Sequence, residues 1–295
     1  MQIEIEGHKA YIHTEKDIDI NLESIILIPG AGMDHRIAKM FDFNSVSKNH
    51  NLISIDLPGH GFTPGPALTS IEDHTDFCIK VLSKLGITNP IIAGHSMGGL
   101  IALNLSLEID VKQTILINTS YPLAVGEMLL DHAKGNLDQA SEFFTKYGVF
   151  NIPDTEIKSK GFGVMGSGFY GRSKGTIKSP YGTKNIESDP EREIKLYPLK
   201  KIFNQTYKEI LSIDLKACAP FRINESAINN LSKIHFVYGG KDKLARFDPD
   251  STVLKNIDKD TKVHIMPDTG HFPFFERPDD LNKLIQKIIP LYFWT

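Results

Sequence analysis

The pentapeptide Gly94-His95-Ser96-Met97-Gly98 carries the residue types of a serine nucleophile held on a tight turn. A short apolar run precedes it and predicts a buried strand, and the small residues that follow it favour a helix. On so sharp a turn the two glycines let strand and helix approach closely, while the Ser96 hydroxyl projects outward. The backbone N–H of Met97, at the helix N-terminus, would then face a developing oxyanion. A chance pentapeptide is the alternative, and the flanking elements disfavour it.

A serine hydroxyl is a weak nucleophile at its own pKa, so this chemistry needs a histidine base and an acid that orients it. Eleven histidines are available, and His271 stands out because it lies in a loop that leaves the last predicted strand. The other histidines that we weighed lie on surface-like segments or within a strand: His8, His13, His50, His74 and His235. His271 is therefore the predicted base.

Two aspartates compete for the role of the acid. Asp242 follows the predicted strand Ile234–Tyr238, at the same edge of the sheet as the loop of His271. Asp268 lies three positions before His271, and so close a neighbour more often serves a local turn. We therefore favour Asp242, which gives the chain order Ser96, Asp242, His271.

Short continuous apolar runs predict the strands that must position these residues. Runs of four or five residues without alternation indicate strands buried on both faces, as in a parallel sheet covered by helices. An alternating pattern over Gln2–Ile5 and Lys9–His13 predicts an additional hairpin of edge strands. The predicted buried strands are Ile25–Ile28, Asn51–Ile55, Pro90–Ala93, Thr114–Ile117, Ile234–Tyr238 and Val263–Met266.

Helical patterns alternate with these runs. The clearest is Ile71–Leu85, which a capping box at Ser70 introduces and Gly86 closes. Others follow Ser96, follow Asp248 and cover Pro278–Ile289. Such alternation predicts an α/β fold with a mostly parallel, doubly wound sheet, whose functional residues gather beyond the carboxyl ends of the strands.

The alternation breaks at residues 121–228, which predicts an insertion between two blocks of one core, 1–120 and 229–295. Its helix-like patches are Gly126–Lys134, Leu137–Lys146 and Lys201–Leu211. Its middle is rich in glycine, but no strand precedes that stretch and no Gly-Lys-Ser/Thr follows it, which disfavours a phosphate loop. A flexible lid that carries aromatic side chains is the favoured interpretation.

Four segments together resemble the α/β-hydrolase superfamily over nearly the whole chain. They are Leu27–Gly32, which we call the oxyanion loop, Asp56–Gly61, the Ser96 turn, and Gly270–Pro273 followed by Glu276-Arg277-Pro278. The order serine, aspartate, histidine is that of this superfamily. The resemblance implies that Ala31 supplies the second oxyanion N–H beside Met97. It also implies a structural role for His60 in its turn.

The sequence departs from the family pattern at Pro29, which stands where a histidine usually precedes the oxyanion glycine. The backbone N–H of Ala31 can still donate. Ser96 in place of an aspartate disfavours the epoxide hydrolase and haloalkane dehalogenase branches. The resemblance implies an acyl-serine intermediate, no metal or organic cofactor, and a helical cap formed by residues 121–228.

The expected substrate is a small molecule, a carboxylic ester of small or medium acyl chain. Aromatic side chains of the insertion could line its apolar pocket, although they could equally form the small core of the insertion. They are Phe143, Phe144, Tyr147, Phe150, Phe162, Phe169 and Tyr170. The same triad also serves C–C bond hydrolases, thioesterases, perhydrolases and aminopeptidases, and fold alone does not separate them. A ligand-binding protein without catalysis is a further alternative.

The composition limits the classes of partner that the protein is expected to bind. The 295 residues include 33 Lys and Arg against 36 Asp and Glu, a formal charge of −3, so no large cationic field attracts nucleic acid. Cys78 and Cys218 are too few and too far apart to indicate a disulfide framework or a zinc site, which predicts buried free thiols. No signal-like start and no stretch of about 18 apolar residues is present, so we expect a cytoplasmic protein without a membrane span.

Overall fold

The computed structural model describes residues 1–40, 49–135, 137–152, 190–207, 209–224, 227, 233–251 and 261–289. Within them, the strands form one sheet of eight in the order β1-β2-β4-β3-β5-β6-β7-β8. The strands are β1 Gln2–Ile5, β2 His8–His13, β3 Glu23–Ile28, β4 His50–Ile55, β5 Ile91–His95, β6 Gln113–Ile117, β7 Ile234–Gly239 and β8 Lys262–Met266.

The sheet is parallel from β4 to β8 and antiparallel only at its β1–β2 end. β3 pairs with β4 and with β5, and β6, β7 and β8 follow in parallel register. The hairpin pairs antiparallel within itself and, through β2, with β4. β4, β5 and β7 are buried along their whole length, as continuous apolar runs predict. The predicted α/β fold with a mostly parallel sheet is confirmed.

Helix α1 (Ile71–Leu85) has the bounds that the sequence predicts. Ser70 Oγ accepts the backbone N–H of Asp73 at 3.0 Å, and Gly86 ends the helix in the left-handed region with φ 67°. α2 (Met97–Glu108) packs against α1 and against β5 and β6, and is buried around most of its circumference. Near the C-terminus lie α9 (Pro273–Glu276) and α10 (Pro278–Ile288). A helix is expected after Asp248, and residues 252–260 of that stretch lie outside the described residues.

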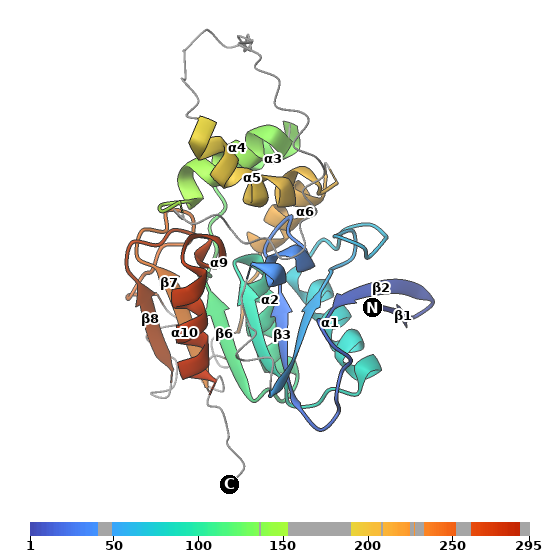
Figure 1. Ribbon diagram of the computed structural model, residues 1–295. Coiled ribbons are helices and arrows are strands. Elements are labelled where there is room, and N and C mark those ends of the chain that lie inside the picture. The colour runs from blue at the N-terminus through green and yellow to red at the C-terminus, as the bar shows by residue number, and fades with distance from the viewer. Residues whose placement is uncertain are drawn as a thin grey trace.

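Four helices lie above the carboxyl ends of the strands (Figure 1). They are α3 (Glu127–Gly135), α4 (Leu137–Gly148), α5 (Pro190–Asn204) and α6 (Ile210–Cys218). α3 and α4 match two predicted patches. The third, Lys201–Leu211, is wrong as one helix, because α5 ends at Asn204 and α6 begins at Ile210. At this break the Thr206 hydroxyl donates to the carbonyl oxygen of Gly32, a tertiary contact that a local pattern does not reveal.

The core lies between the sheet and its helices. Cys78 and Cys218 are free and buried, as predicted.

Among the described residues, the structure contains no helix both long enough and apolar enough to span a bilayer.

Candidate active site

Ser96 lies on the turn between β5 and α2. Its backbone has φ 52° and ψ −117°, a strained conformation for a residue other than glycine. The Ser96 N–H donates to the carbonyl oxygen of Ile117 at 2.9 Å, which fixes the turn against β6. A Cβ on Gly94 would lie 2.1 Å from the carbonyl oxygen of Gly98, and a Cβ on Gly98 would lie 2.2 Å from that of Ile28. Strand and helix therefore meet as closely as the sequence predicts.

Asp242 and His271 come together from two neighbouring strand ends. Asp242 follows β7 and His271 follows β8, and His271 Nδ1 lies 2.8 Å from Asp242 Oδ2. Both residues are buried, with 6% and 3% of their surface exposed. Asp242 Oδ1 also accepts the backbone N–H groups of Leu244 and Ala245, at 2.8 and 3.0 Å. The carboxylate is therefore fixed at both oxygens, and its bond to Nδ1 leaves His271 Nε2 as the nitrogen that can accept a proton.

Asn118, directly after β6, supports this pair. Its Nδ2 donates to Asp242 Oδ2 at 2.7 Å and to the carbonyl oxygen of Gly270 at 3.0 Å. Burial alone would raise the pKa of Asp242, but the nearby His271 ring, the Asn118 amide and the Ala245 N–H together lower it. Asp242 is thus ionised at neutral pH and can stabilise a protonated His271.

The Ser96 hydroxyl forms no hydrogen bond to the residues that the structure describes, His271 included. The neighbouring loops nevertheless lie against it. A Cβ on Gly30 would lie 3.3 Å from Ser96 Cβ, so the oxyanion loop reaches the serine. Ala31 follows Gly30 directly, and Met97 begins α2 and is fully buried. Catalytic hydrogen bonds often tighten only when substrate binds.

Glu276 holds the loop of His271. This buried carboxylate accepts the N–H groups of Gly270 and Phe272, on either side of His271, at 2.9 and 3.1 Å. It also accepts those of Phe150 and Asn151, at 2.9 and 2.8 Å. Burial raises its pKa, although the four N–H donors favour the charged form. The loop of His271 and the chain that leaves α4 are therefore bonded to one side chain.

The aromatic residues of α4 divide between two environments. Phe143 contacts His132 and Tyr147, and Tyr147 is 36% exposed. Phe144 instead stacks on Phe203 at 4.7 Å and packs against Phe272, next to His271. Of the predicted aromatic residues of α4, Phe144 is thus the one that packs against the loop of His271. Three further predicted pocket residues, Phe162, Phe169 and Tyr170, lie outside the described residues.

Two histidines assigned to surface-like segments are in fact buried. His50 is 3% exposed in β4, and His74 is fully buried in α1. His74 faces the interior because its position in the helix falls on the buried side, which a local view of polar residues overlooks. His60 agrees with its implied structural role, since its Nδ1 lies 3.0 Å from the carbonyl oxygen of Pro58 in the same turn.

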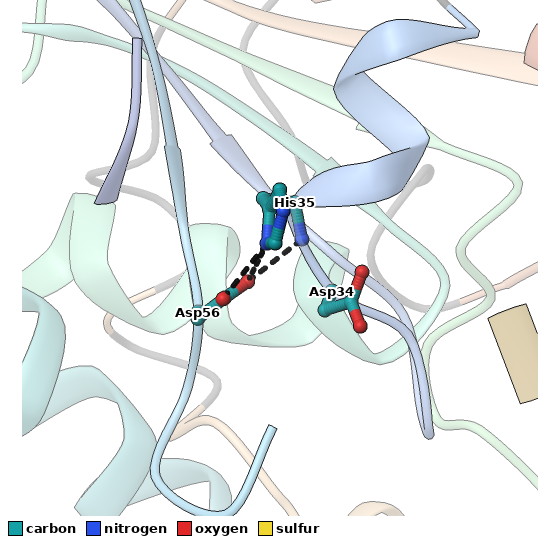
Figure 2. A group of neighbouring side chains, drawn as sticks. All are labelled: Asp34, His35 and Asp56. Carbon is teal, nitrogen blue, oxygen red and sulfur yellow. Dashed lines mark hydrogen bonds and ion pairs between the residues drawn. The ribbon is translucent and has the colours of Figure 1, made fainter. Parts of the chain in front are cut away.

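Asp34, His35 and Asp56 form a group whose ligand atoms lie within 4.8 Å of one another (Figure 2). Protein partners already engage both carboxylates. Asp56 accepts His35 Nδ1 at 2.8 Å and the backbone N–H of Phe62 at 2.9 Å. Asp34 accepts Arg36 Nε at 2.7 Å, and in Figure 2 no interaction joins it to the other two side chains. The group fits an internal polar cluster better than a cation site.

Sequence analysis missed two residues that position the predicted triad, Asn118 and Glu276. Asn118 follows a buried strand and has φ 49°, a conformation that asparagine tolerates better than most residues. A polar residue directly after a buried strand was the signal available for it. Glu276 belongs to a recognised motif, but its contacts with residues 150 and 151 arise only from the fold.

Comparison with known proteins shows which family and which relatives the chain is similar to. The model of the alpha/beta hydrolase family matches residues 25–284. A curated hydrolase of (E)-2-((N-methylformamido)methylene)succinate from Acinetobacter baylyi is 33% identical over 102 residues, which are 34% of this chain and 38% of that protein. A pimeloyl-[acyl-carrier protein] methyl ester esterase from Pseudoalteromonas atlantica is 24% identical over 87% of this chain and 90% of its own.

Among solved structures, the enol-lactonase of Burkholderia xenovorans superimposes with a TM-score of 0.75 at 16% identity, covering 98% of this chain and 99% of that one. At this identity the likeness shows the fold alone. The family model, by contrast, covers most of the chain. The chain therefore belongs to the alpha/beta hydrolase family.

Proposed function

We propose that this protein is a serine hydrolase that cleaves a carboxylic ester of small or medium acyl chain through an acyl-serine intermediate. The observation that carries the proposal is the 2.8 Å bond between His271 Nδ1 and Asp242 Oδ2, beside a serine held on a strained turn. Family membership supports a hydrolase, and the methyl ester esterase among the relatives supports an ester.

In the proposed reaction, His271 Nε2 takes the proton of Ser96 Oγ as that oxygen attacks the carbonyl carbon. The N–H groups of Met97 and Ala31 stabilise the oxyanion. His271 then protonates the alkoxide leaving group, and the alcohol departs from the acyl-serine. A water molecule, deprotonated by the same nitrogen, then attacks the acyl carbon. The bond from that carbon to Ser96 Oγ breaks, His271 returns the proton to Oγ, and the carboxylic acid departs. Asp242 holds the imidazole in the required tautomer throughout.

We also propose that residues 121–228 form a cap on a core of residues 1–120 and 229–295. The position of α3–α6 above the carboxyl ends of the strands supports this division (Figure 1). Substrates of α/β folds bind at that edge of the sheet, so the cap would select among acyl groups. Phe143 and Tyr147 stay candidate pocket residues. Phe144 is the candidate that the contacts favour, because it packs next to the loop of His271.

Two measurements test the proposal. Wild-type protein should react with a fluorophosphonate at Ser96, and Ser96→Ala should not. A panel of p-nitrophenyl esters from acetate to decanoate should show turnover that is highest for small or medium acyl chains. Labelling without turnover of any ester would reject the ester and favour another bond, whereas equal labelling of Ser96→Ala would reject the nucleophile.

A further inference from the structure

We propose that Asp214 is a positioning residue for the oxyanion loop, because its carboxylate clamps the backbone at Gly32 from helix α6. The inference rests on the proposed function, since the loop matters to catalysis only if Ser96 attacks an acyl carbon. It assigns to the proposed cap a role in catalysis beyond substrate selection.

Both backbone polar groups of Gly32 are held by side chains from the segment 121–228. Asp214 Oδ2 accepts the Gly32 N–H at 2.8 Å, and the Thr206 hydroxyl donates to the Gly32 carbonyl oxygen. Asp214 is fully buried, so water does not compete for this bond. The side chain of Leu211, on the same helix, lies 3.0 Å from the place a Cβ on Gly32 would take. α6 therefore packs directly on the loop.

The geometry of the turn transmits this clamp to Ala31. The Met33 N–H donates to the carbonyl oxygen of Gly30 at 3.0 Å, which closes a turn with Ala31 and Gly32 at its centre. Gly32 has φ 67°, the left-handed conformation that glycine adopts without a steric penalty. The bond to Asp214 fixes the peptide plane between Ala31 and Gly32. The preceding plane, which carries the Ala31 N–H, meets it at one Cα, so its direction depends on the same clamp.

His60 pairs with the Asp214 carboxylate but does not contact Gly32 itself. Its Nε2 lies 2.8 Å from Asp214 Oδ2, and its Nδ1 faces the carbonyl oxygen of Pro58, so both ring nitrogens donate and the ring is an imidazolium. Burial disfavours this charge, but the Asp214 carboxylate outweighs the cost and raises the pKa of His60. His74, 4.0 Å from the other carboxylate oxygen, stays neutral because burial lowers its pKa to about 4. The pairing with His60 therefore offsets the cost of burying the Asp214 charge, while the bond to the Gly32 N–H comes from Asp214 itself.

The first test is hydrogen exchange of the oxyanion loop, which does not depend on activity. Asp214→Ala should raise the exchange rate of peptides covering residues 29–34 at least tenfold over wild type. His60→Gln is the matched control, because it disrupts the same buried ion pair and leaves the carboxylate on Gly32. It should change that rate by less than about threefold.

The second test is kinetic. Displacement of a catalytic group by about 1 Å can cost 10²-fold, so Asp214→Ala should lower kcat for an ester by about 10- to 100-fold with KM within about threefold. Asp214→Ala should also weaken the binding of a trifluoromethyl ketone by a similar factor, because the hemiketal that the ketone forms with Ser96 carries an oxyanion. Asp214→Asn retains an oxygen toward Gly32 and should recover most of kcat. His60→Gln should lower kcat far less than Asp214→Ala does, even where the two variants lose the same amount of thermal stability.

Several results would overturn the clamp: unchanged exchange in Asp214→Ala, or equal losses of kcat in Asp214→Ala and His60→Gln. If Asp214→Ala does not fold, Thr206→Val decides, since it releases the Gly32 carbonyl, together with a 3.2 Å contact to the Ile202 carbonyl oxygen within the helix end, and leaves Asp214 in place. It should then raise exchange and lower kcat, and wild-type values of both would reject the clamp. The proposed function would be rejected instead if the wild-type protein neither reacts with fluorophosphonate nor turns over esters. Hydrogen exchange of residues 29–34 would then be the remaining test of the contact between Asp214 and Gly32.

Discussion

The Nε2 of His95 donates a hydrogen bond of 2.8 Å to the carbonyl oxygen of His271. The residue before the proposed nucleophile is thus tied to the proposed base, and the two rings lie 4.9 Å apart at their centroids. A Cβ on Gly30 would lie 2.8 Å from the other nitrogen of His95, so the oxyanion loop also meets this ring. One buried imidazole therefore lies at the junction of the three loops that the proposed reaction needs.

His95 should make the fold sensitive to acid. Complete burial lowers its pKa to about 3, against 6.5 for an unfolded chain. The unfolded state therefore binds more protons between these values, and the free energy of unfolding falls as the pH drops below about 6.5. His95→Gln keeps an N–H donor and does not titrate, so between pH 7 and pH 5 it should lose about 2 kcal/mol less than wild type.

Urea unfolding at pH 7, 6 and 5 measures this difference. His8→Gln, at an exposed position, should keep the pH dependence of wild type. Parallel stability curves for wild type and His95→Gln would contradict the assignment of a neutral, buried His95.

Asp242→Asn should lower kcat for an ester by about 10³- to 10⁴-fold and leave KM nearly unchanged. An asparagine can present its NH₂ group to His271, which favours the wrong tautomer and no longer stabilises the imidazolium. The matched control is Asp268→Asn, an exposed aspartate three positions before His271, which should change kcat by less than about threefold. Steady-state kinetics of both variants decide between the two acids, and a larger loss in Asp268→Asn would reverse the assignment.

Glu276→Gln should destabilise the fold by about 1–3 kcal/mol, because an amide has one acceptor oxygen for four N–H donors. Hydrogen exchange should rise in peptides covering residues 148–152 and 270–272 together, since one side chain holds both. Glu6→Gln, an exposed partner of Lys80, should change stability by less than about 0.5 kcal/mol. Exchange that rises in only one of the two segments would show that Glu276 does not couple them.

Gly94→Ala should abolish ester turnover and greatly lower the yield of folded protein. Its methyl group would lie 2.1 Å from the carbonyl oxygen of Gly98, and neither backbone can move without disturbing Ser96. Gly126→Ala is the control, because the space around a Cβ at that position is open, and its activity and melting temperature should stay near wild type. Wild-type activity in Gly94→Ala would contradict the close approach of β5 and α2.

The sequence by itself determined the elements whose signals are local. Continuous apolar runs predicted the parallel strands, and the cap residues Ser70 and Gly86 predicted the bounds of α1, because both effects act within a few residues. The glycines around Ser96 likewise predicted a close approach of β5 and α2, which only a residue without a side chain permits. The family pattern added the order of Ser96, Asp242 and His271, whose last two members the structure brings within bonding distance.

Only the tertiary structure decided which residues hold these groups in place. Asp214 meets Gly32 across 182 positions, and Asn118 meets Asp242 across 124, so no local pattern signals either bond. The break between α5 and α6 escaped the sequence for the same reason, whereas the burial of His74 follows from its position on the apolar side of α1. The two bonds and the break depend on which surfaces the folded chain brings together, and a polar side chain becomes a clamp only where that folding excludes water from its partner.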